Sequence, residues 1–219
     1  RSLAIVGATG GGKTTLVNLL ARFYEPTSGV IALDGIDYRE RSLNFLQSNL
    51  GVVLQTSHIF AGTVRENIRY GQLSATEDAI RAAAEAAGAA QMIEQLDQGY
   101  DTKIEEGGAS LSSGQKQLIA FTRALLKDPQ ILIMDEATSS VDTLTEKRIE
   151  QGLRALLKDR ISVIIAHRLS TIRHADQICV LDQGQIIEMG RHEDLIAIEG
   201  KYHALFMQQS LSNLWQHQS

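Results

Sequence analysis

The sequence predicts an α/β fold with a mostly parallel sheet, additional antiparallel β elements and an inserted α-helical subdomain. Two observations lead to this fold class: short apolar runs typical of buried strands recur along the chain, and helical patterns separate most of them. A third observation places the insertion, because no strand pattern is found between about Thr63 and Leu126. We therefore expect one domain, residues 1–219, with a core formed by residues 1–54 and 129–219 and a helical subdomain at about residues 55–128.

The individual elements follow from apolar spacing and from turn residues. Strands are expected at residues 3–6, 51–54, 131–135, 162–166 and 178–182. Antiparallel pairs are expected around the turns Asp34-Gly35 and Gln183-Gly184. Helices are expected at residues 15–23, 76–87, 116–126 and 202–215, the second capped by residues 76–78 and the last packed on the domain.

Composition narrows the class of protein. The chain has 219 residues, of which 43 % are hydrophobic, and a formal net charge of −5, which is typical of a globular domain with a sizeable core. Because no basic stripe accompanies this acidity, we expect no nucleic-acid partner. The single cysteine, Cys179, lies in an apolar run and is expected to be a buried hydrophobe. No apolar run approaches the ~18 residues of a membrane span, so this chain itself is expected to be soluble.

The most specific motif follows the first expected strand and opens the first expected helix. It matches the pattern G-x-x-x-x-G-K-[ST] and consists of Gly7, Ala8, Thr9, Gly10, Gly11, Gly12, Lys13 and Thr14, with Thr15 next in the helix. In this pattern the glycine-rich backbone directs N–H groups at phosphate oxygens, and the start of the helix adds its own N–H groups and dipole. Lys13 is expected to reach the β- and γ-phosphates, and the Thr14 hydroxyl to bind Mg²⁺.

Two further segments carry candidate site residues. The apolar run of residues 131–134 ends in Asp135 and Glu136; an acidic residue at such a strand end holds Mg²⁺ in phosphoryl-transfer enzymes, and the next one is suited to polarise an attacking water. The sequence LSSGQ, residues 111–115, precedes a helix. It fits either an anion site or a simple helix cap, and the residues alone leave both possibilities open.

Taken together, these segments resemble the ATP-binding cassette (ABC) ATPases over nearly the whole chain. The resemblance rests on six elements in order: GATGGGKT, Gln55 in VVLQ, LSSGQ, ILIMDE, the triplet ending in Asp142, and His167 in IIAHRLS. Residues 60–68 and 105–108 are similar to the exporter (multidrug and lipid-type) branch, in which the second segment marks a bacterial subgroup that often forms heterodimers.

The resemblance implies a P-loop NTPase (RecA-like) core that binds ATP and Mg²⁺. It implies that Gln55 contacts Mg²⁺ or the attacking water, and that His167 contacts the γ-phosphate. Catalytic roles then fall to Glu136, His167, Gln55 and Lys13, and the metal ligands to Thr14, Gln55 and Asp135. It further implies that Ser112, Gly114 and Gln115 touch the ATP bound by a second cassette, and that Asp142 links the two sites.

The function implied is that of a Mg²⁺-dependent ATPase motor of an exporter. Two cassettes, identical or different, are expected to close head to tail around ATP, attached to a transmembrane domain fused N-terminally at the cytoplasmic face of a membrane. Two alternatives stay open: a soluble ABC ATPase of DNA repair, chromosome structure or translation, and a non-hydrolytic partner cassette.

Two departures from the family pattern bear on nucleotide binding. Ser113 stands where the family usually has glycine, so its side chain could crowd the phosphate. The aromatic residue that stacks on adenine upstream of the phosphate loop has no counterpart here, and the chain is expected to be a fragment lacking that segment. Because base stacking on aromatic side chains is worth about 1–3 kcal/mol, ATP affinity is expected to be about tenfold or more weaker.

Overall fold

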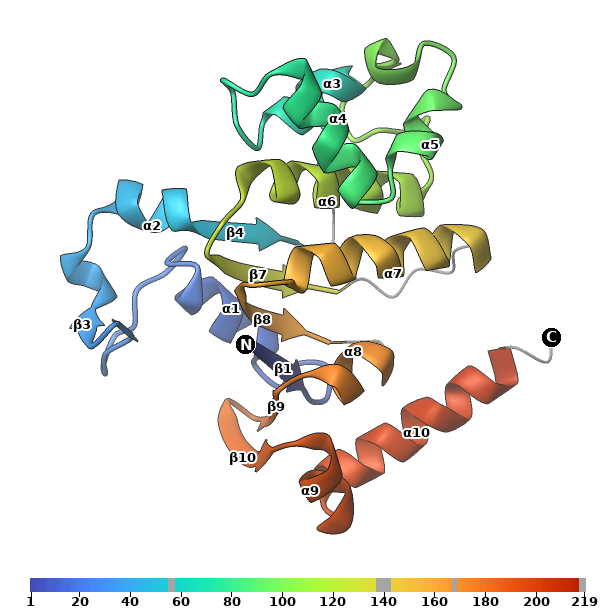
Figure 1. Cartoon of the computed structure of the whole chain (residues 1–219). Coiled ribbons are helices and arrows are strands. Elements are labelled where there is room, and N and C mark those ends of the chain that lie inside the picture. Colours follow the sequence, from blue (N-terminus) through green and yellow to red (C-terminus); the bar gives the residue numbers. More distant parts are fainter. Residues whose placement is uncertain (55–57, 137–142, 167–168, 217–219) are drawn as a thin grey trace. The chain divides into compact units, whose positions relative to one another are not determined.

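The structure is a computed structural model that describes the whole chain except residues 55–57, 137–142, 167–168 and 217–219 (Figure 1). The chain divides into two compact units. The first comprises Arg1–Gln47, Ile133–Thr138 and Ile161–Ser219, and the second Ser48–Leu132 and Ser139–Arg160. The expected division of the domain into a core and a helical subdomain at residues 54 and 129 stays a prediction.

A central sheet organises the first unit. Strand β1 (Ser2–Val6) pairs in parallel with β8 (Ile161–Ile165) on one side and with β9 (Gln177–Asp182) on the other. Strand β10 (Gln185–Gly190) then turns back antiparallel to β9. The strand order continues past β8 to β7 (Ile131–Asp135), whose first two residues belong to the second unit. Strand β4 (Leu50–Val53) belongs to the second unit. The predicted mostly parallel α/β sheet is confirmed.

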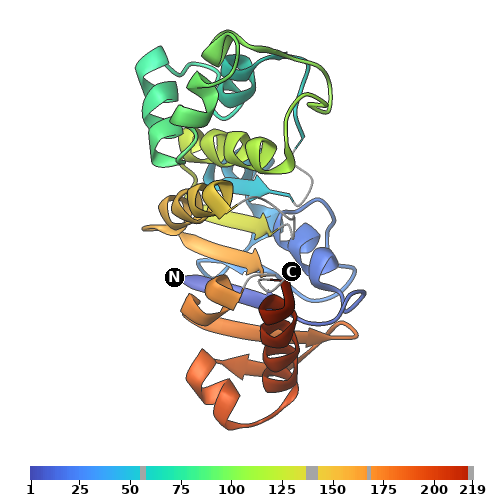
Figure 2. The ribbon, with the colours of Figure 1, turned by 90° about the vertical axis from the view of Figure 1, so that its right-hand side faces the viewer.

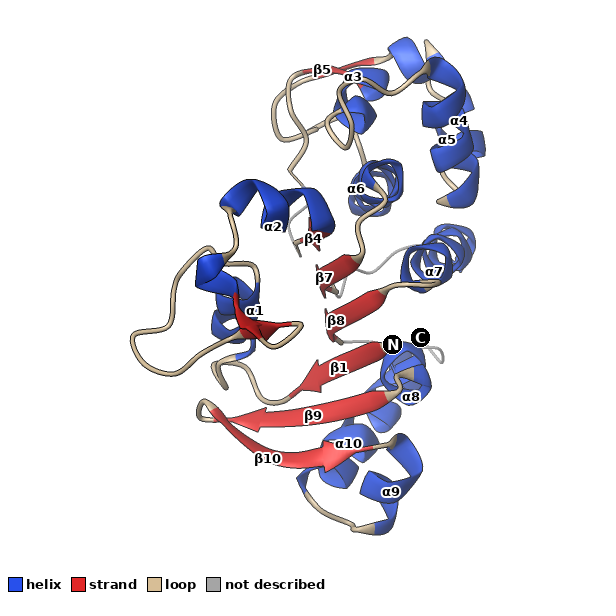
Figure 3. Cartoon of the chain, turned by 60° about the vertical axis from the view of Figure 1, so that its left-hand side comes forward, coloured by secondary structure: helices blue, strands red, loops and turns tan. Residues whose placement is uncertain are grey.

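Helices cover both faces of the first unit's sheet. Helix α1 (Lys13–Leu20) lies on one face, and α8 (Leu169–His174), α9 (His192–Ala197) and α10 (Lys201–Gln216) lie on the other (Figure 3). Between these layers the strands are apolar on both sides, as expected for parallel strands, and Ala4, Ile5 and Ile164 are buried. Cys179 is buried among them, and burial raises the pKa of its thiol. Its predicted role as a small hydrophobe is confirmed.

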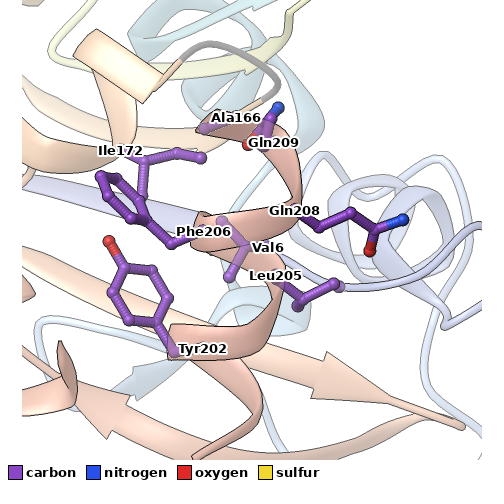
Figure 4. A pocket seen from close by; sticks show the side chains of 9 residues that line it. Val6, Ala166, Ile172, Tyr202, Leu205, Phe206, Gln208 and Gln209 are labelled. Atoms are coloured by element: carbon purple, nitrogen blue, oxygen red, sulfur yellow. The ribbon is translucent and has the colours of Figure 1, made fainter. Parts of the chain in front are cut away.

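Helix α10 crosses the direction of the strands (Figure 2) and closes a pocket of about 250 Å³ over the ends of β1 and β8. The rings of Tyr202 and Phe206 on α10 line this pocket opposite Ile172 on α8 (Figure 4). The Tyr202 hydroxyl lies 2.7 Å from His192 Nδ1, and burial raises the pKa of Tyr202 to about 12. The predicted packing of the last helix on the domain is therefore confirmed.

Three short elements and one helix that extends from the first unit into the second complete the first unit. They are β2 (Ala32–Leu33), β3 (Ile36–Asp37), the 3₁₀ turn η1 (Tyr38–Glu40) and α2 (Leu43–Asn49), whose last two residues belong to the second unit. Both predicted antiparallel pairs are confirmed, because β2 pairs with β3 and β9 with β10. Helix α1 ends at Leu20, three residues before the predicted end at Phe23. Arg22, just beyond the helix, has a positive φ of 55°.

The second unit is built around one long helix, α6 (Ser113–Lys127), which contacts β4 and three other helices (Figure 1). The further helical elements are α3 (Val64–Arg69), α4 (Glu77–Ala86), α5 (Ala90–Glu94), α7 (Thr143–Leu157) and the 3₁₀ turn η2 (Gly99–Asp101). Thr76 caps α4 through Oγ1, which accepts from Ala79 N at 3.3 Å, as the sequence predicts.

One expectation for this unit is wrong. We expected no strand between about residues 63 and 126, but β5 (Gly62–Thr63) pairs antiparallel with β6 (Lys103–Ile104). Each of these strands has only two residues, so neither can display the alternation by which strands are found in a sequence. Within the described part of the chain, no helix combines the length and the apolar composition needed to cross a membrane.

Candidate nucleotide-binding site

Positive φ values at glycines shape the predicted phosphate loop, which links β1 to α1. Gly7, Gly10 and Gly12 have φ of 153°, 80° and 100°, a region that L side chains rarely adopt. At Gly7 a Cβ atom would also lie 2.1 Å from the carbonyl oxygen of Leu181. The backbone there can pass so close to β9 only because the residue is glycine.

The turn between β9 and β10 contacts the backbone of this loop, which the sequence analysis did not predict. Gly184 N donates to Gly11 O at 3.0 Å, and the carbonyl oxygen of Leu181 would lie 3.1 Å from a Cβ at Gly11. The contact joins residues more than 170 positions apart. Its only signal in the sequence is the Gln183-Gly184 turn, which predicts a hairpin but not what the hairpin touches.

Lys13 is held inside the loop by the loop's own backbone. Its Nζ donates to the carbonyl oxygens of Gly7 and Ala8, each at 2.9 Å. Burial lowers the pKa of Lys13, while the nearby charge of Asp135 acts in the opposite direction. The ammonium group therefore lies at the loop with an acidic side chain in electrostatic reach.

Helix α1 begins without a side-chain cap among the described residues, because its N-cap is Gly12. The first N–H groups of any helix lack partners within the helix. Thr14 and Thr15, in its first turn, are both exposed. The start of α1 can therefore offer N–H groups and a hydroxyl to an anion.

Two acidic residues end β7. Asp135 is its last residue and is half-buried, and Glu136 follows it with 2 % of its surface exposed. Glu136 N donates to Ile165 O at 3.0 Å, and Glu136 Oε1 accepts from Thr171 Oγ1 at 2.9 Å. The sequence analysis did not identify Thr171, because a lone threonine in a helix carries no motif of its own.

Residues of the LSSGQ segment form a reciprocal cap at the start of α6, in the second unit. Gln115 N donates to Ser112 Oγ at 3.2 Å, and Ser112 N donates to Gln115 Oε1 at 2.8 Å. Of the two possibilities left open, the helix cap is confirmed. Because the cap uses Ser112 Oγ as an acceptor, the hydroxyl proton can still donate to a ligand, and contact of Ser112, Gly114 and Gln115 with phosphate stays a prediction.

Three predicted site residues, Gln55, Asp142 and His167, lie outside the described residues. In the described part of the chain no group of three or more His, Cys, Asp or Glu side chains could hold a metal by itself. The predicted Mg²⁺ ligands Thr14 and Asp135 nonetheless supply hydroxyl and carboxylate oxygens, the donors that Mg²⁺ prefers alongside substrate phosphates.

Comparison with known proteins decides the family. The family model described as "ABC transporter" matches residues 1–139, which include the phosphate loop, LSSGQ and the two acids Asp135 and Glu136. The chain belongs to the ABC transporter family. An uncharacterized ABC transporter ATP-binding protein of Bacillus subtilis, YfiC, is 53 % identical over 95 % of this chain and 35 % of its own length. An ATP-dependent lipid A-core flippase of Desulfotalea psychrophila is 49 % identical over 95 % of this chain and 36 % of its own.

A solved structure agrees with these relatives. The ATP-bound structure of a bacterial Atm1-family ABC exporter matches with a TM-score of 0.88 and 45 % identity, covering 94 % of this chain and 36 % of that one. The predictions of an ABC exporter ATP-binding domain and of a P-loop NTPase fold are thereby confirmed. The chain spans about a third of the length of these relatives.

Proposed function

We propose that the chain binds and hydrolyses Mg²⁺-ATP and thereby powers an exporter of which it is the nucleotide-binding domain, at the cytoplasmic face of a membrane. The observation that carries the proposal is the position of Lys13, whose ammonium group is held by two carbonyl oxygens of a glycine loop next to an uncapped helix start. The names of the relatives support the export role, since they include a flippase and an exporter.

Binding of the phosphates falls to residues 7–15. The N–H groups of the loop and of the first turn of α1 would donate to phosphate oxygens. Ala8, Thr9 and Gly10 are exposed, so the phosphates can reach the loop from solvent. Lys13 would exchange its contacts with Gly7 and Ala8 for the β- and γ-phosphates. This exchange places a positive charge where negative charge gathers during phosphoryl transfer.

The metal ligands in this proposal are Thr14, Gln55 and Asp135. Bound Mg²⁺ would neutralise charge on the β- and γ-phosphates and orient them. The protein's own part is to present the Thr14 hydroxyl in the first turn of α1 and the Asp135 carboxylate at the end of β7, where Asp135 already acts electrostatically on Lys13.

Glu136 would accept the proton of the attacking water, and the products would be ADP and phosphate. His167 would contact the γ-phosphate, and Gln55 would orient the water. Burial of Glu136 suits this task, because a fixed carboxylate shielded from bulk water holds its geometry.

The site is proposed to be completed by a second cassette, identical or different. Ser112, Gly114 and Gln115 of one chain would meet the γ-phosphate held by the loop of the other, and Asp142 would connect the two sites. The start of α6 suits this role, because its cap leaves the proton of the Ser112 hydroxyl available. The transmembrane domain, which selects the transported substrate, is expected in the same polypeptide.

Mixing two inactive variants tests the shared site. Lys13→Ala would disable the loop of its own chain, and Ser112→Arg would block the site of the partner. In a mixed dimer one site keeps both intact parts, so an equal mixture is expected to regain about a quarter of the parent's Mg²⁺-dependent phosphate release. A mixture that stays inactive would contradict a site shared between two copies of this chain. A parent protein without Mg²⁺-dependent hydrolysis would contradict the proposed function as a whole.

A further inference from the structure

The buried carboxylate of Glu136 is held by a residue outside the recognised motifs. Thr171, in α8, donates from Oγ1 to Glu136 Oε1 at 2.9 Å, and only 7 % of Thr171 is exposed. Both residues belong to the first unit, so the contact lies within one compact body. A carboxylate this deeply buried requires hydrogen-bond donors to offset its lost hydration, and the Thr171 hydroxyl is one of them.

Glu136 is anchored at its backbone as well as at its side chain. Its N–H donates to the carbonyl oxygen of Ile165, the last residue of β8. Ile165 and Thr171 lie on either side of His167 in the sequence, so one short stretch of chain holds Glu136 at both ends. An acidic side chain fixed in this way has few alternative orientations.

We propose that Thr171 is a positioning residue for Glu136: its hydroxyl holds one carboxylate oxygen and so keeps the carboxylate in the orientation in which it meets the attacking water. The inference rests on the function proposed above, in which Glu136 takes the proton of that water. An ionised carboxylate can accept about four hydrogen bonds, so a bond from Thr171 is compatible with a further bond from the water. Many enzymes orient a catalytic base through a third group in the same manner.

A second buried threonine shows what a purely structural hydroxyl looks like in this protein. Thr122, in α6, is fully buried, and its Oγ1 donates to Leu118 O at 2.8 Å, one turn back in the same helix. That bond satisfies the hydroxyl locally and reaches no ionisable group. The Thr171 hydroxyl instead donates to the carboxylate of Glu136, a residue 35 positions away that directly follows strand β7. Thr122 is therefore a matched control for Thr171.

The test uses the protein in its natural full-length form and steady-state ATP hydrolysis. Thr171→Val keeps the shape of the side chain and removes the hydroxyl, so we expect kcat to fall about tenfold or more, because small misplacement of a catalytic group is costly. The KM for ATP should stay unchanged, since the phosphate loop is intact. Thr171→Ser keeps the hydroxyl and should hydrolyse close to the parent's rate. Thr122→Val should retain the parent's kcat.

Two further measurements separate positioning from general damage. In a Glu136→Gln background, Thr171→Val should lower kcat no further, because the residue it positions is already replaced. If Thr171→Val does not fold, Thr171→Ala serves in its place, with folding checked by thermal unfolding.

Two outcomes would overturn the inference alone. Each of them applies while Glu136→Gln is inactive. One is a Thr171→Val variant whose kcat equals or exceeds the parent's, with or without a raised KM. The other is a Thr171→Ser variant that is as slow as Thr171→Val. If Glu136→Gln itself hydrolyses ATP like the parent, the catalytic assignment of the proposed function fails, and the role of Thr171 fails with it.

Discussion

Two helices of this chain, α1 and α6, begin after short loops rich in glycine or serine. Both have N–H groups at their start that lack partners within the helix, and the two helices treat these groups in opposite ways. At the start of α6, Ser112 and Gln115 cap each other's backbone N–H groups. At the start of α1, the N-cap is Gly12, which has no side chain with which to cap. The start of α6 therefore satisfies two of its N–H groups with its own side chains, whereas the start of α1 has no side-chain cap and can offer its N–H groups to a ligand.

The comparison teaches that similar loops need not have similar tasks. The α1 loop depends on glycine, because at Gly7 any side chain would meet the backbone of β9. The α6 loop depends on two polar side chains, and its stability comes from the cap itself. We therefore expect changes in the α1 loop to act on nucleotide binding. Changes in the α6 loop should separate effects on stability from effects on catalysis.

Among changes to these two loops, the largest effect is expected from Gly7→Ala. The new Cβ would lie 2.1 Å from Leu181 O, a backbone atom, so the loop or β9 must move. We expect a loss of about 1–3 kcal/mol in the free energy of unfolding and a fall in ATP affinity of at least about tenfold, because the aligned N–H groups would be displaced. Urea unfolding and ATP titration measure the two effects.

The matched control is Gly10→Ala. Gly10 also has a positive φ, of 80°, but among the described atoms nothing lies within 4 Å of its would-be Cβ. Only backbone strain of roughly 1 kcal/mol is then expected. Equal losses of ATP affinity in the two variants would show that the approach of Gly7 to β9 is unimportant.

A smaller and more selective effect is expected from Ser112→Asp. Aspartate caps helices about as well as serine, so the free energy of unfolding should stay within about 0.5 kcal/mol of the parent's. Its negative charge would repel the γ-phosphate of a partner's ATP, so hydrolysis should fall at least about tenfold. Rates of phosphate release and urea unfolding are the measurements.

Thr76→Ala provides the control for capping alone. Thr76 caps α4, so its loss should cost about 1 kcal/mol of stability while hydrolysis stays unchanged. If Ser112→Asp hydrolysed ATP at the parent's rate, the start of α6 would be a helix cap and nothing more.

The smallest effect concerns pH and Lys13. Burial lowers its pKa in the folded chain, so above that lowered pKa, and up to the ordinary lysine value of about 10.4, the unfolded chain binds more protons. Without nucleotide, the stability of the parent relative to Lys13→Met should therefore rise with pH in that window. Urea unfolding of both proteins at several alkaline pH values checks the sign, and a fall with rising pH would contradict it.

Much of this architecture is predictable from short stretches of sequence. The strands β1, β7 and β9 are apolar runs, and the phosphate loop is a contiguous motif, so local patterns suffice for them. The cap at Ser112 was one of two possibilities because capping and anion binding use the same residue types.

Other features depend on contacts between distant segments and leave no local pattern. Strands β5 and β6 pair across about 40 residues, and the β9–β10 turn supports the phosphate loop from the far end of the chain. The contact of Thr171 with Glu136 is of the same kind. Only the folded chain shows which distant residues meet.

The most direct test of the account is Mg²⁺-dependent ATP hydrolysis by the parent and by Glu136→Gln, with ATP binding measured on the same preparations. We expect the parent to hydrolyse ATP and Glu136→Gln to bind it with similar affinity while its rate falls by about 100-fold or more, because it loses the base but keeps the loop. A Glu136→Gln protein that hydrolyses ATP at the parent's rate would contradict the assignment of Glu136, and with it the proposed mechanism.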